Sequence, residues 1–227
     1  MTTVEIDEVA TRPSPTEARV DPSDRIRVHG KFFFAGNQKH FVKGVTYGPF
    51  AQGSHGSQFP EPAMVDKDFA LMREAGVNTV RVFTVPPIWL LEAAHRAELK
   101  LLIGLSWAEH IAFLDSVSIQ AEIREAVAAG VRNCCRHPAV FGYLVGNEIP
   151  PDIVRWHGAE GVRRFVQCLV AAVRDEDPKA LISYANFPST EYLTIDFTDF
   201  ICFNVYLHDE SAFRRYIARL HNLAVDQ

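Results

Sequence analysis

From residue 26 onward, short apolar runs alternate with stretches of helical periodicity. The runs are rich in Val, Ile, Leu and Phe and lack a strict polar alternation, which is typical of strands buried on both faces of a parallel sheet. We therefore expect six parallel strands, at Phe41–Tyr47, Asn78–Thr84, Lys100–Trp107, Val140–Gly146, Ala180–Tyr184 and Asp199–Tyr206.

The segments between these runs carry apolar residues at the spacing of an amphipathic helix. Gly76 is well placed to end one helix, Pro86-Pro87 to begin the next, and His137-Pro138 to end a third. Apolar stripes predict helices through Ile119–Val131, Val162–Val173 and Phe213–Leu220.

Repeated strand–helix units predict parallel strands with right-handed crossovers. An open doubly wound sheet would carry a Gly-rich phosphate loop after its first strand, but that strand ends in Gly44–Pro49, which has no GxGxxG pattern. We therefore expect an α/β fold, a (β/α)8 TIM barrel, with a short N-terminal β-hairpin within Ile26–Val42. Because a barrel needs eight units and six are visible, the barrel is expected to be incomplete, stopping before strands seven and eight.

The first 24 residues are acidic and rich in Pro, Ser and Thr. This composition predicts a flexible N-terminal segment at 1–24, followed by a C-terminally truncated barrel domain at 25–227. The segment lacks the basic start and apolar core of a signal peptide, and the most apolar run, Val82–Ala94, is too short to span a membrane.

Charge and cysteine content exclude several classes of partner. The net charge is -5 and Lys and Arg form no cluster, so nucleic acid is not an expected partner. The four cysteines form no CxxC pair, which favours free buried thiols in a reducing compartment and hence a cytoplasmic location; a disulfide or metal framework is the alternative. The nine histidines show no ligand spacing, so we expect no metal and no cofactor.

The candidate chemistry lies at the ends of the predicted strands, where the reactive residues of a parallel barrel gather. One carboxylate, Glu148, directly follows a wholly apolar strand. Aromatic rings stack on the apolar faces of sugars and amides bind their hydroxyls, so the surrounding residue types predict a carbohydrate cleft. The candidates at the strand ends are Tyr47, Arg81, Trp107, Glu109, His110, Asn147, Glu148, Asn186, Asn204, Tyr206 and His208.

Three segments resemble glycoside hydrolases of clan A, with family 2 as the nearest relative. Arg136–Glu148 resembles the fourth-strand signature, Leu71–Arg81 the first helix and second strand, and Asp199–Tyr206 the sixth strand. The resemblance covers about residues 26 to 227, with the three motifs in the right order. A similar domain is fused to family 2 glycosyltransferases in bacteria, so fusion to or association with a glycosyltransferase is a further expectation.

The resemblance implies a retaining mechanism, in which two carboxyl groups lie about 5–5.5 Å apart. Glu148 matches the general acid/base, and Asn147 matches the amide that binds the sugar 2-hydroxyl. Arg81 and Tyr206 match residues that orient and hydrogen-bond the nucleophile. That nucleophile is a Glu at the end of the seventh strand, which this chain does not contain, so the chain alone is expected to be inactive or impaired.

Each candidate also has a structural interpretation. Asn147 fits a turn, Arg81 a structural ion pair, Tyr206 a core tyrosine with a bonded hydroxyl, and Glu148 a carboxylate near a helix start. Trp107 fits either a sugar platform or packing at the barrel rim. The remaining residues are rim or subsite candidates: Tyr47, His110, Asn186, Asn204 and His208.

Two functional hypotheses remain from the sequence. The first is a glycosidase that hydrolyses O-glycosidic bonds of a β-linked glycan with retention. The second is a catalytically incomplete, carbohydrate-binding or accessory part of a larger hydrolase or glycosyltransferase fusion. A cofactor-dependent α/β enzyme is disfavoured, because no phosphate loop is present.

Overall fold

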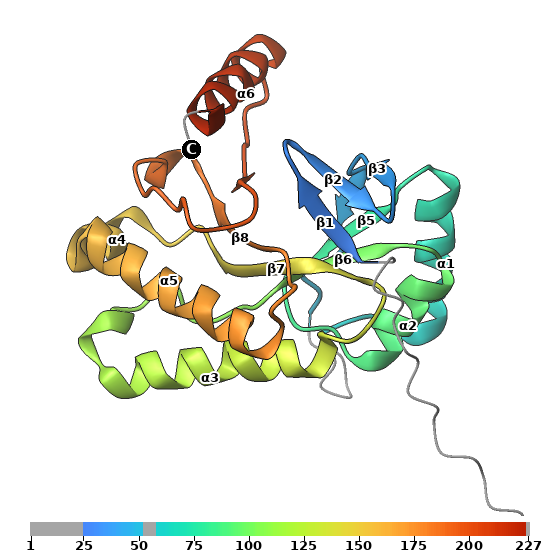
Figure 1. Ribbon diagram of the computed structural model, residues 1–227, viewed down its shortest axis with the longest axis horizontal. Helices are drawn as coiled ribbons and strands as arrows, with labels where there is room; N and C mark the ends of the chain where they lie inside the picture. The colour runs from blue at the N-terminus through green and yellow to red at the C-terminus, as the bar shows by residue number, and fades with distance from the viewer. Residues whose placement is uncertain (1–24, 52–57, 226–227) are drawn as a thin grey trace, which may run out of the picture.

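The central feature of the computed structural model is a curled, six-stranded parallel sheet that forms half of a barrel (Figure 1). The structure describes residues 25–51 and 58–225, so the segment expected to be flexible, 1–24, lies outside the described residues. The sheet order follows the chain, and each strand pairs in parallel with the next. Its strands are β4 (Gly44–Thr46), β5 (Thr79–Val82), β6 (Lys100–Gly104), β7 (Val140–Asn147), β8 (Ile182–Asn186) and β9 (Cys202–Phe203).

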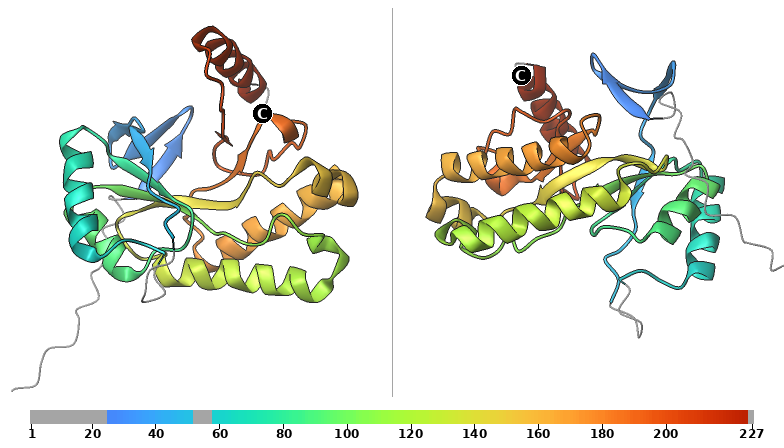
Figure 2. Two further views of the ribbon diagram at one scale, coloured as in Figure 1. Left: turned by 180° about the vertical axis from the view of Figure 1, so that it is seen from behind. Right: turned by 60° about the horizontal axis from the view of Figure 1, so that its bottom comes forward.

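Helices follow the strands and cover the outer side of the sheet (Figures 1 and 2). Apolar residues of these helices and of the strands, such as Phe69, Leu90, Val127, Val166 and Tyr143, form the main buried core. The covering helices are α1 (Pro62–Glu74), α2 (Ile88–Arg96), α3 (Val117–Cys134) and α5 (Ala159–Glu176).

The central strand β7 is buried over nearly its whole length, which explains why its sequence reads as a continuous apolar run. Two glycines allow neighbouring strands to approach. A Cβ atom at Gly142 would lie 2.5 Å from the carbonyl oxygen of Leu181, and one at Gly104 would lie 2.5 Å from that of Phe83. The apolar strand therefore runs through the sheet and delivers its polar end, Asn147, to the carboxyl edge.

A three-stranded antiparallel sheet closes the opposite end of the barrel. It comprises β1 (Ile26–His29), β2 (Phe32–Ala35) and β3 (Gln38–His40). Phe33 of this sheet packs edge-on against Phe141, at the start of β7, and against Phe200. The N-terminal sheet thus covers the amino ends of the strands and leaves their carboxyl ends to the site.

The last helix, α6 (Glu210–Val225), stands apart from α3 and α5 (Figures 1 and 2). It contacts the rest of the chain through Glu191, which accepts a hydrogen bond from the hydroxyl of Tyr216 at 2.8 Å and pairs with Arg219. Phe213 and Ile217, in its apolar stripe, remain exposed. The stripe predicted a helix correctly, but its apolar side meets little of the described chain.

The predicted elements agree with the structure in kind and order, with shorter edge strands. The sixth strand was expected at Asp199–Tyr206, but β9 contains two residues because it pairs with β8 alone. Three short elements were not predicted from the sequence: the helix α4 (Pro151–His157) and the turns η2 (Phe113–Asp115) and η3 (Pro188–Thr190). All four cysteines carry free thiols, and of these Cys134 alone is fully buried.

Candidate active site

Glu148 follows β7 directly, at the carboxyl edge of the sheet. Its backbone has a φ of +53°, a left-handed conformation that is uncommon for residues other than glycine. The amide of Asn147 donates to Oε1 of Glu109 at 2.8 Å, that of Glu148 to the carbonyl of Ala185 at 2.9 Å, and that of Ile149 to the hydroxyl of Tyr184 at 2.9 Å. Neighbouring elements therefore hold three consecutive amides around this bend.

Two donors converge on the carboxylate of Glu148. The side-chain amide of Asn204 and the hydroxyl of Tyr206 each donate to Oε1 at 2.6 Å. Within the described residues, Oε2 receives no hydrogen bond. The hydrogen bond to Glu148 is the main cause that raises the pKa of Tyr206 above its ordinary value. The Tyr206 hydroxyl therefore keeps its proton and donates it to this bond. One carboxylate oxygen is thus fixed while the other is available.

Arg81 on β5 joins this group from across the sheet. Its Nη1 donates to Oδ1 of Asn204 at 2.7 Å, and its Nη2 donates to Oδ1 of Asn147 at 2.6 Å. Asn204 also donates to Oδ1 of Asn147 at 2.9 Å. Because Oδ1 of Asn147 accepts two bonds, its own NH2 group is turned away from them. Arg81 Nε is buried without a hydrogen-bond partner among the described residues.

Two side chains from the loop after β6 bind the backbone of β7. The indole of Trp107 donates to the carbonyl of Val145 at 2.9 Å and packs edge-on against Phe113 and Phe165. Glu109 accepts the amide of Asn147. Burial, the largest cause, raises the pKa of Glu109 to about 7; the hydrogen bond from Asn147 lowers it and the charge of Glu148 raises it.

The structure brings four of the strand-end candidates into one network, namely Arg81, Asn147, Glu148 and Tyr206. Asn204 joins them. Tyr206 lies beyond β9, is 68% exposed, and binds Glu148, whereas the resemblance implied a bond to the nucleophile. Sequence reasoning noted Glu109 after the third strand but missed its contact with Asn147. The available signal was a carboxylate two residues after Trp107, on the loop that faces β7.

Two rim candidates take structural positions instead. Tyr47 is buried against Phe69 and donates its hydroxyl to Asp68 at 2.6 Å, so it packs under α1. Asn186 is buried, and its side-chain amide donates to the carbonyls of Thr190 and Leu193 in the loop that follows β8. Tyr47 therefore packs into the helical layer, whereas Asn186 packs into the loop that follows β8.

The other candidates lie around the network without joining it. Trp107 takes the packing alternative, since its indole is held by Val145 and two phenylalanines. His110 and His208 are exposed.

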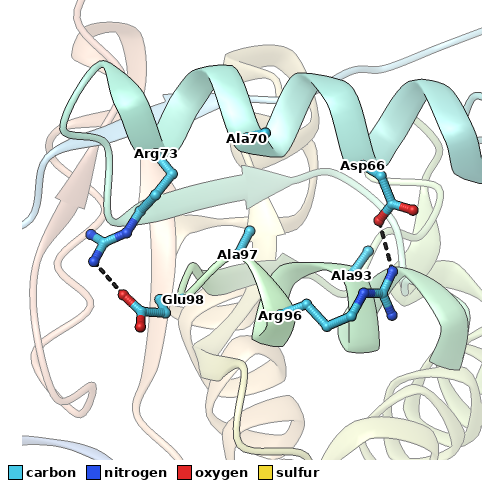
Figure 3. Close-up of a pocket in the computed structure, with 7 residues that line it drawn as sticks. All are labelled: Asp66, Ala70, Arg73, Ala93, Arg96, Ala97 and Glu98. Atoms are coloured by element: carbon cyan, nitrogen blue, oxygen red, sulfur yellow. Dashed lines mark hydrogen bonds and ion pairs between the residues drawn. The ribbon is translucent and has the colours of Figure 1, made fainter.

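A separate groove of about 480 Å³ lies between α1 and α2 on the helical side (Figure 3). Its floor contains Ala70, Ala93 and Ala97, and the ion pairs Arg73–Glu98 and Arg96–Asp66 flank it. No residue of the Glu148 network lines this groove. It is therefore a surface feature of the helical layer.

Within the described parts of the chain, no three His, Cys, Asp or Glu side chains gather in a way that could hold a metal ion. In the same residues, no helix combines the length and the apolar character needed to cross a membrane. Glu148 itself is a carboxylate that accepts from an amide and a hydroxyl, and a guanidinium binds the same amide residue.

Residues 16–187 match the glucanosyltransferase family, glycoside hydrolase family 72. The chain belongs to this family. It is 26% identical over 180 residues to 1,3-beta-glucanosyltransferase GAS2 of Saccharomyces cerevisiae, covering 71% of this chain and 31% of that protein. It is 22% identical over 156 residues to GAS5 of the same yeast, covering 64% of this chain and 31% of the relative. This member of the family thus spans about a third of the length of these curated relatives.

Solved structures share the fold of this glucanosyltransferase-family chain. Bacteroides uniformis beta-glucuronidase 2 aligns with a TM-score of 0.72 and 19% identity, covering 87% of this chain and 25% of the other. Saccharomyces cerevisiae Gas2p in complex with laminaripentaose aligns with a TM-score of 0.60 and 18% identity, covering 86% and 51%. The chain is thus clan A-like with a TIM-barrel-like fold, while the expected assignment to family 2 is not confirmed.

Proposed function

We propose that this chain acts on a β-1,3-linked glucan by a retaining mechanism, with Glu148 as general acid/base. The observation that carries the proposal is the convergence of Asn147, Asn204 and Tyr206 around Glu148, with Arg81 behind them. The substrate class comes from the names of the yeast relatives and from the laminaripentaose bound to one of them.

Each side chain has a role in the proposed reaction. Glu148 donates a proton to the glycosidic oxygen and later removes one from the acceptor. The NH2 group of Asn147, turned away from Arg81 and Asn204, is free to bind a sugar hydroxyl. If the acceptor from which Glu148 removes the proton is water, the outcome is hydrolysis. If that acceptor is a sugar hydroxyl, the outcome is transfer, so one site supports both reactions.

The second carboxylate of the retaining pair is not assigned to Glu109. Oε1 of Glu109 is occupied by the amide of Asn147, and the side chain is mostly buried. The nucleophile expected at the end of a seventh strand stays a prediction. We therefore expect this polypeptide to turn over aryl β-glucosides near background unless a nucleophile is supplied.

The test supplies azide to the 227-residue chain with phenyl and 2,4-dinitrophenyl β-glucosides. Azide attacks the anomeric carbon, the phenolate leaves, and α-glucosyl azide forms. Glu148→Gln should slow the azide reaction of the phenyl substrate by about 10²–10⁴-fold, because phenolate leaves poorly without a proton. The dinitrophenyl substrate should be slowed much less, because its leaving group needs no acid.

The control is Glu122→Gln, which changes an exposed glutamate of α3. Equal rates for wild type and Glu148→Gln on the phenyl substrate would disprove the acid/base role. Robust turnover without azide would mean that a carboxylate of this chain is the nucleophile.

The second candidate is carbohydrate binding without catalysis. It is favoured by the open half-barrel, in which the edge strands β4 and β9 each pair on one side within the described residues. Saturable binding of laminaripentaose by calorimetry, with no turnover of either glucoside in azide, would support it. Association with a glycosyltransferase and a cytoplasmic location also stay predictions.

A further inference from the structure

The contact between Glu109 and β7 continues a ladder that the backbone cannot complete. The backbone pairing of β6 and β7 extends to the bond from the amide of Leu105 to the carbonyl of Leu144, at 2.9 Å. Beyond it, side chains take over: Trp107 donates to the carbonyl of Val145, and Glu109 accepts the amide of Asn147. The two-residue step on the loop matches the two-residue step on the strand.

We propose that Glu109 is a positioning residue, whose carboxylate holds the amide of Asn147 and thereby fixes the bend that presents Glu148. This inference rests on the proposed function and deepens it. The left-handed backbone of Glu148 is unfavourable for a residue other than glycine and persists only where its surroundings enforce it. A charge-assisted hydrogen bond to the preceding amide is a strong constraint of that kind.

The carboxyl group of Glu109 is fitted closely to the strand. A Cβ atom at Gly146 would lie in ordinary contact with Oε1 of Glu109, at 3.5 Å, and tightly against the ring of Tyr184, at 3.1–3.2 Å, so glycine leaves room chiefly for that ring. The titratable groups that face Glu109 are Glu148, from the end of β7, and Tyr184, from β8. Burial raises the pKa of the Tyr184 hydroxyl, which therefore stays neutral, so among the described residues Glu148 is the neighbour whose charge acts on Glu109.

This setting makes the constraint sensitive to protonation. With a pKa of about 7, Glu109 gains charge as the pH rises through neutrality. The ionised form accepts the amide of Asn147 more strongly than the neutral acid does. The amide proton of Asn147 should therefore report the charge of Glu109.

The test compares Glu109→Gln with Glu109→Ala. Glutamine keeps a carbonyl acceptor without a charge, so it should retain laminaripentaose binding and the azide-dependent reaction within a few fold. Alanine removes the acceptor and should weaken both roughly tenfold or more, as expected for a lost buried hydrogen bond. In ¹⁵N-labelled wild type, the Asn147 amide should titrate near pH 7, and in Glu109→Gln this titration should disappear. Glu122→Gln, at an exposed position on α3, should behave as wild type.

The spectroscopic readout separates this inference from the proposed function. An Asn147 amide that does not respond to pH in the wild type, or responds equally in Glu109→Gln, would overturn the inference even if Glu148 is confirmed as the acid/base. Glu109→Gln that folds and binds laminaripentaose but is as inactive as Glu148→Gln would show that Glu109 reacts directly, which also overturns a positioning role. If Glu109→Ala does not fold, the glutamine variant alone decides.

Discussion

At the scale of single residues, the site is a set of hydrogen bonds that leaves Glu148 one bonded and one available oxygen. Asn204 and Tyr206 fix Oε1, and Arg81 fixes the amides beside it. This arrangement holds Glu148 in one orientation, which would lower the ordering cost of the proposed reaction.

Glu109 should give stability a specific pH dependence. Its pKa is raised from 4.5 to about 7, so the folded state holds the proton more tightly than the unfolded state. The contribution of Glu109 to the free energy of unfolding is therefore fully present below about pH 4.5. It falls by about 3 kcal/mol as the pH rises toward 7. Urea unfolding of wild type and Glu109→Gln between pH 4.5 and 7.5 measures it.

The difference in unfolding free energy between wild type and Glu109→Gln isolates the effect of Glu109. Other groups act in the opposite direction, but they do so equally in both proteins. Burial lowers the pKa of His40 and His137, and this makes stability rise with pH in wild type and variant alike. The unfolding free energies of wild type and Glu109→Gln should therefore diverge across this window. Parallel pH profiles would show that Glu109 titrates at its ordinary pKa.

The central site residues were predictable from the sequence because each ends a recognisable apolar run. Asn147 ends β7 and Glu148 follows it, and Arg81 lies one residue before the end of the short strand β5. Tyr47 and Asn186 also lie at the ends of apolar runs, yet they bond to α1 and to the loop after β8, because the direction of a terminal side chain depends on the segment packed beside it. The role of Glu109 was not predictable, since no local pattern reports a hydrogen bond across 38 positions.

At the scale of elements, strand spacing depends on glycines that no hydrophobic pattern explains. Gly142 lies in β7, where an added methyl group would meet the backbone carbonyl of Leu181. Gly161 lies in α5, where it would touch the side chain of Leu114 at an ordinary 3.4 Å. The same substitution therefore has opposite consequences in the two elements.

We expect Gly142→Ala to destabilise the protein by roughly 3 kcal/mol or more, because backbone cannot move aside as a side chain can. Gly161→Ala should stabilise it by about 0.5–1 kcal/mol, because alanine loses less conformational entropy than glycine when the helix forms. Denaturant unfolding of the two variants beside wild type checks both. A neutral Gly142→Ala would mean that β7 and β8 are less closely spaced than described.

At the scale of the whole molecule, the half-barrel has two strands paired on one side. The described residues of β4 and β9 turn unpaired backbone groups outward, and such edges pair readily with other chains. Val45 on β4 is exposed at one of these edges. The curled sheet and its order were predictable from six repeated units, whereas the shortness of its outer strands was not, because pairing partners decide strand length.

The open edges should cause self-association. We expect the 227-residue chain to form concentration-dependent oligomers in sedimentation velocity, and Val45→Lys to reduce them by placing a charge on the edge. Val117→Lys is the matched control, because Val117 is exposed at the start of α3, away from the sheet edge. A sharp monomer at all concentrations would contradict the prediction.

The side-chain ladder after β6 also constrains the length of the loop that carries Trp107 and Glu109. Trp107 and Glu109 match Val145 and Asn147 step for step, so the number of residues between Gly104 and Glu109 is set by the strand beside it. One inserted residue there would carry the carboxylate past its amide and release the bend at Glu148. A longer loop beyond His110, which is exposed, would leave both contacts in place. The distal part of this loop can therefore change in length without releasing the bend, whereas the part before Glu109 cannot.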